Sequence, residues 1–210
     1  MAICSPHGRF HKEVFALPGF LSDPILIMGV QDIFHGTPEI DEAFQYGTLK
    51  ECLESRGYED VCTVDWQDQR TDIKVNLAVP SALPIRANTI IDIGTIEHVS
   101  NPHVVLQNYV SWLNVGGHLF IHTPVRGYLG HGLFTFSPEY IPATLRHNGF
   151  EIVHEKYSCI DKEVTITSHG DALECSSTYV DVLTWVVGHK VRELEGELQS
   201  IQQGLYGDPA

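Results

Sequence analysis

The chain is poor in basic residues. Among its 210 residues, 13 are lysine or arginine and 27 are aspartate or glutamate, so the formal net charge at pH 7 is −14 with histidine neutral. A surface this acidic repels the phosphate backbone of a nucleic acid and anionic lipid headgroups. We therefore expect neither a nucleic-acid partner nor a membrane partner.

Long apolar runs and paired cysteines are also missing. No stretch approaches the roughly 18 consecutive apolar residues that a membrane-spanning helix needs. The five cysteines are scattered and form no C-x-x-C pair, which is typical of a reducing compartment. Residues 1–10 (MAICSPHGRF) contain proline, glycine and arginine where a secretory signal would need an unbroken apolar stretch. These features predict a cytoplasmic protein.

The motifs of two common enzyme classes are absent as well. The sequence holds neither a G-x-S-x-G nucleophile elbow nor a G-x-x-x-x-G-K-[ST] phosphate-binding loop. This excludes hydrolases of the elbow type and nucleoside triphosphatases with that loop.

The composition is that of an average globular protein, with 43% hydrophobic and 19% charged residues. Short apolar runs alternate with stretches of helical length, which predicts a single α/β domain over residues 1–210 with a parallel sheet, right-handed crossovers and helices on both faces. Residues 1–22 are expected to be an N-terminal extension, irregular over 1–10. Helices are expected at 37–56, 102–113 and 137–147, and strands at 25–30, 61–65, 73–79, 89–94, 118–122, 150–157 and 180–187.

The last part of the chain, residues 191–203 (VRELEGELQSIQQ), has apolar residues three or four positions apart: Val191, Leu194, Leu198 and Ile201. This spacing predicts an amphipathic helix, followed by a tail to residue 210. Its apolar side would either pack against the body of the protein or form a homodimer contact.

The stretch from Thr89 to Phe150 carries a series of short motifs in a fixed order. They are Glu97-His98-Val99, Leu113, Gly116-Gly117, Pro124, Ser137-Pro138-Glu139 and Gly149-Phe150. In order and spacing this stretch resembles the second half of the class I S-adenosylmethionine-dependent methyltransferases, in particular their small-molecule branch. The resemblance implies a class I methyltransferase-like (Rossmann-like) fold with a seven-stranded sheet, helices on both faces and an antiparallel last strand. It also implies S-adenosylmethionine as cofactor and methyl transfer to a small polar acceptor.

In an open parallel sheet, ligands bind outside the carboxyl ends of the strands. Asp65 ends the second strand, where the family has an acidic residue that accepts hydrogen bonds from the ribose hydroxyls. Trp66 would cover the adenine ring or pack in the core. Asn76 stands near the place of a polar residue that contacts adenine in the family, or serves in a turn. Near the methyl group the resemblance points to Asp92 or Gly94.

The glycine-rich loop departs from the family's E/D-x-G-x-G-x-G pattern. After the first strand the chain reads Met28-Gly29-Val30-Gln31-Asp32-Ile33-Phe34-His35-Gly36, in which only Gly29 aligns securely. Either Gln31 and Asp32 supply polar contacts in place of the tight loop, or the cofactor site is weakened or lost. The second case corresponds to a non-catalytic protein of methyltransferase fold with a binding or assembly role.

Three residues are the candidate catalytic bases that would take a proton from the acceptor: Glu97, His122 and His131, with His98 also available. His131 lies in segment 124–136 (PVRGYLGHGLFTF), which follows the fifth strand. Three glycines in this segment predict a lid over the site, the alternative being a surface loop with a solvated histidine.

Twelve histidines also raise the question of a metal site. His118 and His122 would lie on one face of a strand but about 13 Å apart, too far to bind one zinc ion. His122, His131 and Glu97 could form the 2-His-1-carboxylate set of a metal-dependent oxygenase. The methyltransferase resemblance is favoured over this alternative, and no metal is expected.

Overall fold

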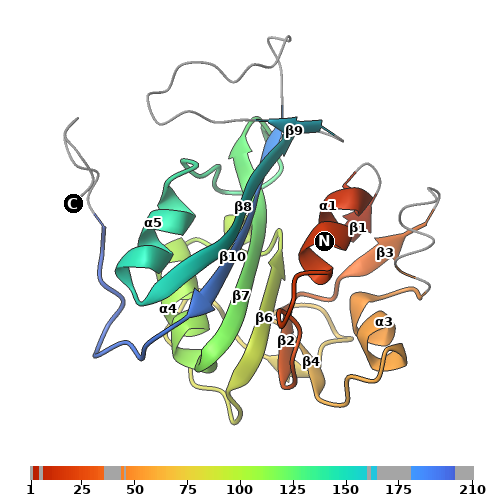
Figure 1. Ribbon diagram of the computed structural model, residues 1–210, viewed down its shortest axis with the longest axis horizontal. Coiled ribbons are helices and arrows are strands. Elements are labelled where there is room, and N and C mark those ends of the chain that lie inside the picture. Colours follow the sequence, from red (N-terminus) through yellow and green to blue (C-terminus); the bar gives the residue numbers. More distant parts are fainter. Residues whose placement is uncertain are drawn as a thin grey trace.

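The computed structural model describes residues 2–4, 7–35, 44, 46–159, 162–164 and 181–201. Its main feature is an eight-stranded sheet (Figure 1) with the strand order β5-β4-β2-β6-β7-β10-β8-β9. In that order the strands are Ile73–Lys74, Val61–Asp65, Ile25–Met28, Ala87–Ile93, Leu113–Arg126, Val182–Lys190, Phe150–Cys159 and Lys162–Val164.

The first five strands of this order run parallel, with β2 in their centre. Met28 at the end of β2 lies opposite Val64 of β4 and Asp92 of β6. All four residues of β2 are buried, as expected for a parallel strand that is covered on both faces. The carboxyl ends of β2, β4, β6 and β7 therefore meet at one edge of the sheet.

Strand β10 is antiparallel to both of its neighbours, β7 and β8. This confirms the expected seven-stranded sheet with an antiparallel last strand. The structure adds one element, the three-residue strand β9, which pairs antiparallel with β8 at the edge.

Helices cover both faces of the sheet, as expected (Figure 1). Helices α4 (Pro102–Trp112) and α5 (Tyr140–His147) pack on one face, over a core that includes Leu106 and Leu145. Helices α1 (Gly8–Phe15) and α3 (Leu49–Ser55) pack on the other face, over a core that includes Phe10 and Leu53.

The N-terminal region differs from the expected irregular extension. Residues 8–15 form α1, although no side chain caps its first turn. Phe10 and Val14 are buried against the sheet, and the ring of Phe10 stacks on Trp185 with centroids 5.2 Å apart. Strand β1 (Ala2–Cys4) pairs in parallel with β3 (Asp32–Phe34) in a separate two-stranded sheet. Tertiary packing rather than local sequence signals holds this helix.

Two predicted elements are shorter than expected. The strand predicted at 73–79 ends at Lys74. Of the helix predicted at 37–56, the structure shows only α3, Leu49–Ser55. Residues 46–48 are not helical, and residues 36–43 and 45 lie outside the described part of the chain. The capping box of Thr48 and Glu51 fixes the start of α3.

The prediction of a helix at 191–203 is wrong for residues 191–201, which form no helix. Gly196 has a φ of +88°, which ends any helical continuation. Asn148 next to α5 binds the backbone of Gln199 through both its amide nitrogen (3.0 Å) and its amide oxygen (2.8 Å). Leu198 is buried in the core under α5. The segment thus packs on the body in a non-helical form, and the apolar contact of Leu198 is made within the chain.

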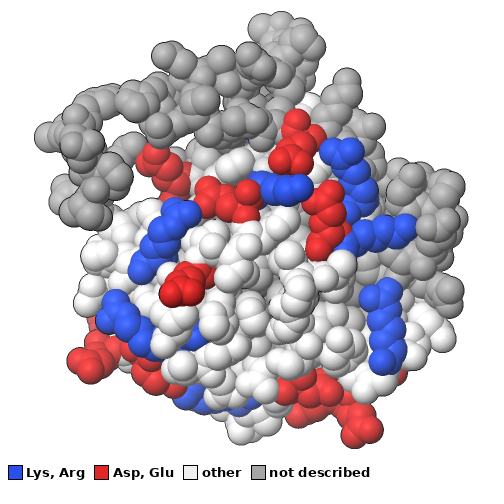
Figure 2. All heavy atoms as spheres, viewed as in Figure 1, with Lys and Arg blue, Asp and Glu red and all other residues white. Residues whose placement is uncertain are grey.

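Acidic and basic side chains alternate over the face shown in Figure 2, where the basic ones do not gather into one patch. Among the described residues, no helix combines the length and the apolar character that crossing a bilayer requires.

Three histidines lie together between α1 and the sheet. The ring of His122 stacks on Trp185 at 3.9 Å, and His11 and His7 lie edge-on to His122 at 5.5 and 5.9 Å between centroids. Nε2 of His11 and both ring nitrogens of His122 have no hydrogen-bond partner among the described residues. Burial lowers the pKa of His11 to about 3, and it lowers the pKa of His122 well below its ordinary value.

We expect the free energy of unfolding to fall as the pH drops below about 6.5, because the unfolded chain then protonates these histidines while the folded protein keeps them neutral. Each of the two contributes up to about 1.4 kcal/mol per pH unit. Urea unfolding should show that the free energy of unfolding differs less between about pH 5 and about pH 7 in His122→Phe than in the parent. The matched control is His147→Phe at an exposed position, which should retain the full difference. An undiminished difference in His122→Phe would show that His122 is not held neutral.

Candidate active site at the carboxyl edge of the sheet

Gly29 follows β2 and lies where three loops of this edge converge. Its φ of +73° is a conformation that glycine adopts without strain. A Cβ atom placed on Gly29 would lie 3.4 Å from Gln31 Nε2, 3.5 Å from Thr95 Oγ1 and 3.7 Å from Asp65 Oδ2. The loops after β2, β4 and β6 thus bring polar side chains to one point.

Asp65 offers one carboxylate oxygen toward this point. Its Oδ1 accepts hydrogen bonds from the backbone N–H groups of Gln67 (2.6 Å) and Asp68 (2.9 Å), which fix the carboxylate in a turn. Its Oδ2 is the oxygen that lies beside Gly29. Asp65 therefore caps a turn with Oδ1, while its Oδ2 lies at the predicted ligand position, where its role as an acceptor stays a prediction.

Trp66 and Asn76 differ in their surroundings. The side chain of Trp66 is 59% exposed, so it does not pack in the core and its ring is open to a ligand. Asn76 Oδ1 accepts a hydrogen bond from the N–H of Ala78 at 3.0 Å, which corresponds to the turn alternative.

The loop after β2 is filled by side chains where the family has glycines. With Gly29 aligned to the first glycine, Gln31 and Ile33 stand at the second and third, and they are 1% and 6% exposed. Gln31 Nε2 donates to the carbonyl oxygen of Met28 at 2.7 Å. Strand β3 begins at Asp32, the residue after Gln31.

Asp32 is already paired within the protein. Arg70 forms two hydrogen bonds to its carboxylate, at 2.7 and 3.0 Å, and also binds Asp68 at 2.7 Å. The hydrogen bonds from Arg70 lower the pKa of Asp32. Arg70, which the sequence analysis did not single out, thus ties β3 to the loop after β4.

Asp92, expected near the methyl group, is fully buried instead. Its carboxylate accepts hydrogen bonds from the backbone N–H groups of Thr95 (2.6 Å) and Ile96 (3.1 Å) and from the hydroxyl of Tyr109 (2.8 Å). Burial raises its pKa to about 6. Both oxygens serve inside the protein, so Asp92 shapes the turn at Gly94 and does not face a ligand.

Thr95 was missed by the sequence analysis. It follows Gly94, whose φ is +77° and whose N–H donates to the carbonyl oxygen of His122 at 2.8 Å. The hydroxyl of Thr95 donates to the carbonyl oxygen of Met28 at 3.0 Å, which joins the loop after β6 to the end of β2. The Gly-Thr pair directly after an apolar strand was the available signal.

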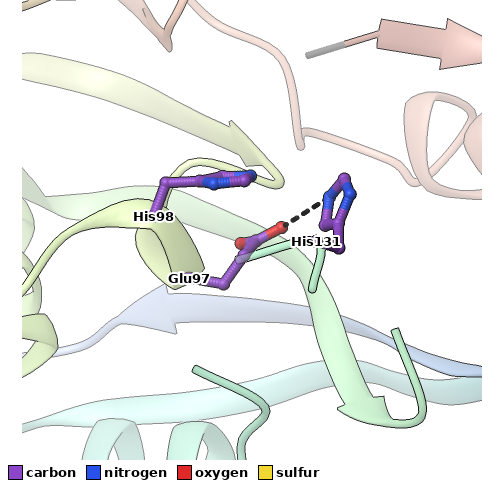
Figure 3. Close-up of side chains that lie close together, drawn as sticks. All are labelled: Glu97, His98 and His131. Atoms are coloured by element: carbon purple, nitrogen blue, oxygen red, sulfur yellow. Dashed lines mark ion pairs between the residues drawn. The ribbon is translucent and has the colours of Figure 1, made fainter. Parts of the chain in front are cut away.

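Glu97, His98 and His131 form a second group at this edge (Figure 3). Glu97 and His98 lie on the short 3-10 helix η1 (Ile96–His98), and His131 lies in the loop after β7. Glu97 is 1% exposed, and its Oε2 accepts a hydrogen bond from Thr123 Oγ1 at 2.8 Å. Its Oε1 lies 3.9 Å from His131 Nε2, and the rings of His98 and His131 have centroids 5.0 Å apart.

Burial shifts the pKa values of Glu97 and His98. Burial, with a smaller effect from the negative charge of Asp92, raises the pKa of Glu97 to about 8. Partial burial and the neighbouring His131 lower the pKa of His98.

His122, the third expected base, does not join this group. Side chains alternate along β7, so Thr123 contacts Glu97 while His122 points to the opposite face and stacks on Trp185. The expected set of His122, His131 and Glu97 is therefore wrong as a constellation, and His98 takes the place of His122.

The glycine-containing segment 124–136 is hydrogen-bonded to the edge of the sheet. The N–H groups of Leu133 (2.8 Å) and Phe134 (3.1 Å) donate to the carbonyl oxygen of Glu97, and the N–H of Phe136 donates to that of Pro124 (3.0 Å). Leu129 at its tip is 99% exposed. This arrangement fixes His131 beside Glu97 and leaves the tip in solvent.

Solved structures match this chain at low sequence identity. TehB from Haemophilus influenzae matches 88% of this chain at 14% identity with a TM-score of 0.50, and the chain spans 62% of the length of TehB. The [4+2]-cyclase SpnF matches 87% of this chain over 81% of its own length, at 15% identity and with a TM-score of 0.47. A candidate methyltransferase from Bacillus halodurans C-125 matches 89% of this chain over 99% of its own length, at 12% identity and with a TM-score of 0.46. No protein-family model and no curated protein sequence matches the chain. The likeness to TehB and the strand order show a class I methyltransferase-like fold.

We expect Glu97 to titrate near pH 8 and to influence stability. Between its ordinary pKa of 4.5 and the folded value of about 8, the folded protein holds a proton that the unfolded chain releases. The contribution of Glu97 to the free energy of unfolding therefore falls as the pH rises through this range, by up to about 1.4 kcal/mol per pH unit. Glu97→Gln stays neutral and should lack this slope in urea unfolding with EDTA present. Glu151→Gln, at an exposed position on β8, is the control and should keep this slope. If the free energy of unfolding depended on pH in the same way in the parent and in Glu97→Gln, the raised pKa of Glu97 would be refuted.

Proposed function

We propose that the protein binds S-adenosylmethionine at the carboxyl edge of the sheet and transfers its methyl group to a small polar acceptor. The observation that carries this proposal is the convergence of Asp65 Oδ2 and Thr95 Oγ1 on Gly29. This point lies at the centre of the parallel strands in a class I methyltransferase-like sheet, where open α/β sheets bind their ligands.

The adenosine part of the cofactor would lie beside β4. A carboxylate oxygen is an acceptor only, which suits the two hydroxyls of a ribose, and Asp65 Oδ2 is such an oxygen. The exposed ring of Trp66, the next residue, offers an apolar face on which adenine can stack.

The acceptor would approach between the loops after β6 and β7. Methyl transfer needs the sulfonium carbon in line with the nucleophile and, for a hydroxyl acceptor, removal of its proton. A base works best when its pKa lies near the ambient pH, and Glu97 with a pKa of about 8 meets this condition. His131, with its side chain 48% exposed, is open to an acceptor that enters from solvent.

A second candidate function is favoured by the loop after β2. The buried residues Gln31 and Ile33 stand where the family has glycines, so their side chains would occupy space that glycine leaves open. In a protein whose methionine subsite is closed in this way, the same fold would serve as a binding or assembly module without methyl transfer.

The proposal predicts that S-adenosylmethionine and its demethylated product both bind in calorimetric titration. Asp65→Ala should weaken binding by about 1.5–3 kcal/mol, the range for hydrogen bonds to a charged group, while the fold stays intact. Asp60→Ala is the matched control because Asp60 precedes the same strand at the opposite edge of the sheet. Equal affinity in Asp65→Ala and Asp60→Ala would show that the adenosine does not bind at Asp65, and no heat with either ligand in the parent would refute the proposal.

A further prediction concerns Gln31. Glycine at this position lets the backbone approach the cofactor, so Gln31→Gly should bind the demethylated product about tenfold more tightly than the parent, or about 1.4 kcal/mol. Gln31→Met retains the side-chain volume and should show no gain. Binding by Gln31→Gly alone, with none by the parent, would favour the non-catalytic function. Equal affinities in both variants would show that the Gln31 side chain is no obstacle.

A further inference from the structure

We propose that Glu97, His98 and His131 bind one divalent transition-metal ion. Each of the three side chains offers one ligand atom, and these three atoms all lie within 4.8 Å of one another. Figure 3 shows the carboxylate of Glu97 and the ring of His131 turned toward each other, with the ring of His98 beside them. The inference rests on this geometry and not on cofactor binding.

The ligand atoms, which lie up to 4.8 Å apart, must come closer together to hold one ion. Two ligand atoms on a tetrahedral zinc ion lie about 3.3 Å apart, given metal–ligand bonds of about 2.0 Å. The Glu97 Oε1 to His131 Nε2 distance is 3.9 Å. His98 and His131 are both exposed, so rotation of their side chains can close the remaining gap without moving the sheet.

Glu97 is the fixed member of the set. Its side chain is buried, and the hydrogen bond from Thr123 Oγ1 to Oε2 (2.8 Å) orients the carboxylate. The other oxygen, Oε1, is thereby aimed at His131. Such a hydrogen bond to a ligating carboxylate is the usual support of a metal site.

The loop after β7 brings His131 to this position. The N–H groups of Leu133 and Phe134 both donate to the carbonyl oxygen of Glu97. Gly132 allows this close approach, because a Cβ atom there would lie 3.0 Å from both Cγ and the carbonyl oxygen of Glu97. His131 is thus held next to Glu97 by the residues that follow it.

The ligand types decide which ions fit. Two imidazoles and one carboxylate suit Zn²⁺, Co²⁺, Ni²⁺ or Fe²⁺, whereas Mg²⁺ and Ca²⁺ prefer oxygen ligands throughout. With three protein ligands, of which two are exposed, the ion keeps coordination positions for water or for an oxygen or nitrogen atom of a small molecule.

The test is calorimetric titration of the metal-free protein with ZnCl₂, together with the visible spectrum of the Co²⁺ form. We expect one ion per chain, and an affinity at least about tenfold lower in His98→Ala, His131→Ala and Glu97→Gln. His147→Ala removes an exposed histidine on α5 and should bind as the parent does. MgCl₂ should give no comparable binding.

Two outcomes would overturn the inference. One is the absence of zinc binding at millimolar concentration. The other is equal affinity in His98→Ala, His131→Ala and His147→Ala, which would place the ion on other histidines. Both ligand histidines are exposed, so their alanine variants should fold even if Glu97→Gln does not. Titration with S-adenosylmethionine is a separate measurement, so failure of the proposed function and failure of the metal site can be told apart.

Discussion

The buried carboxylate of Asp92 is the interaction on which the whole edge of the sheet depends. It lies at the end of a central strand and accepts hydrogen bonds from the N–H groups of Thr95 and Ile96. The hydroxyl of Tyr109 on α4 supplies a third. A carboxylate in an apolar core is costly unless such donors satisfy it, so the turn after β6 and the position of α4 are fixed together.

That turn positions both candidate sites. On one side of it, Thr95 reaches the carbonyl oxygen of Met28 and the space above Gly29, where the cofactor is proposed to bind. On the other side, Glu97 reaches Thr123 of β7 and the loop that carries His131. Only Ile96 separates Thr95 from Glu97, so any shift of η1 would move both groups at once. The two sites are therefore geometrically linked through a single short segment.

The sequence was sufficient to predict the sheet because buried parallel strands leave unbroken apolar runs such as Ile25–Met28. It was also sufficient to place Asp65 at the end of a strand, on the side of the sheet where open α/β sheets bind ligands, although the binding role of Asp65 stays a prediction. It failed at α1, since that helix is stabilised by Phe10 and Val14 against the sheet and has no cap to signal it. It failed at the C-terminal segment because regular apolar spacing says nothing of the turn at Gly196.

In the candidate site, too, the features that the sequence did not predict depend on residues that are distant in sequence. A carboxylate at the end of a strand can either bind a ligand or accept hydrogen bonds inside the protein. Asp92 does the latter, because Tyr109, which is distant in sequence, donates a hydrogen bond to it. The sequence alone does not distinguish the positions of His98 and His122. In the structure, the alternation of side chains along β7 turns His122 toward Trp185.

The departure from the family pattern is confined to one side of the fold. The motifs after Thr89 build the turn held by Asp92, the Glu97 group and the loop that rests on it. In the loop after β2, the buried residues Gln31 and Ile33 stand where the resemblance implies glycines. Substitutions in that loop change the space beside Gly29 without disturbing β2, because the strand is held by its neighbours on both sides. A fold of this kind can therefore change the residues beside Gly29 without moving the acidic and histidine side chains of the adjoining loops. The arrangement of Glu97 and His131 is in that sense independent of the loop after β2, and it depends instead on Thr123, on Gly132 and on the turn at Asp92.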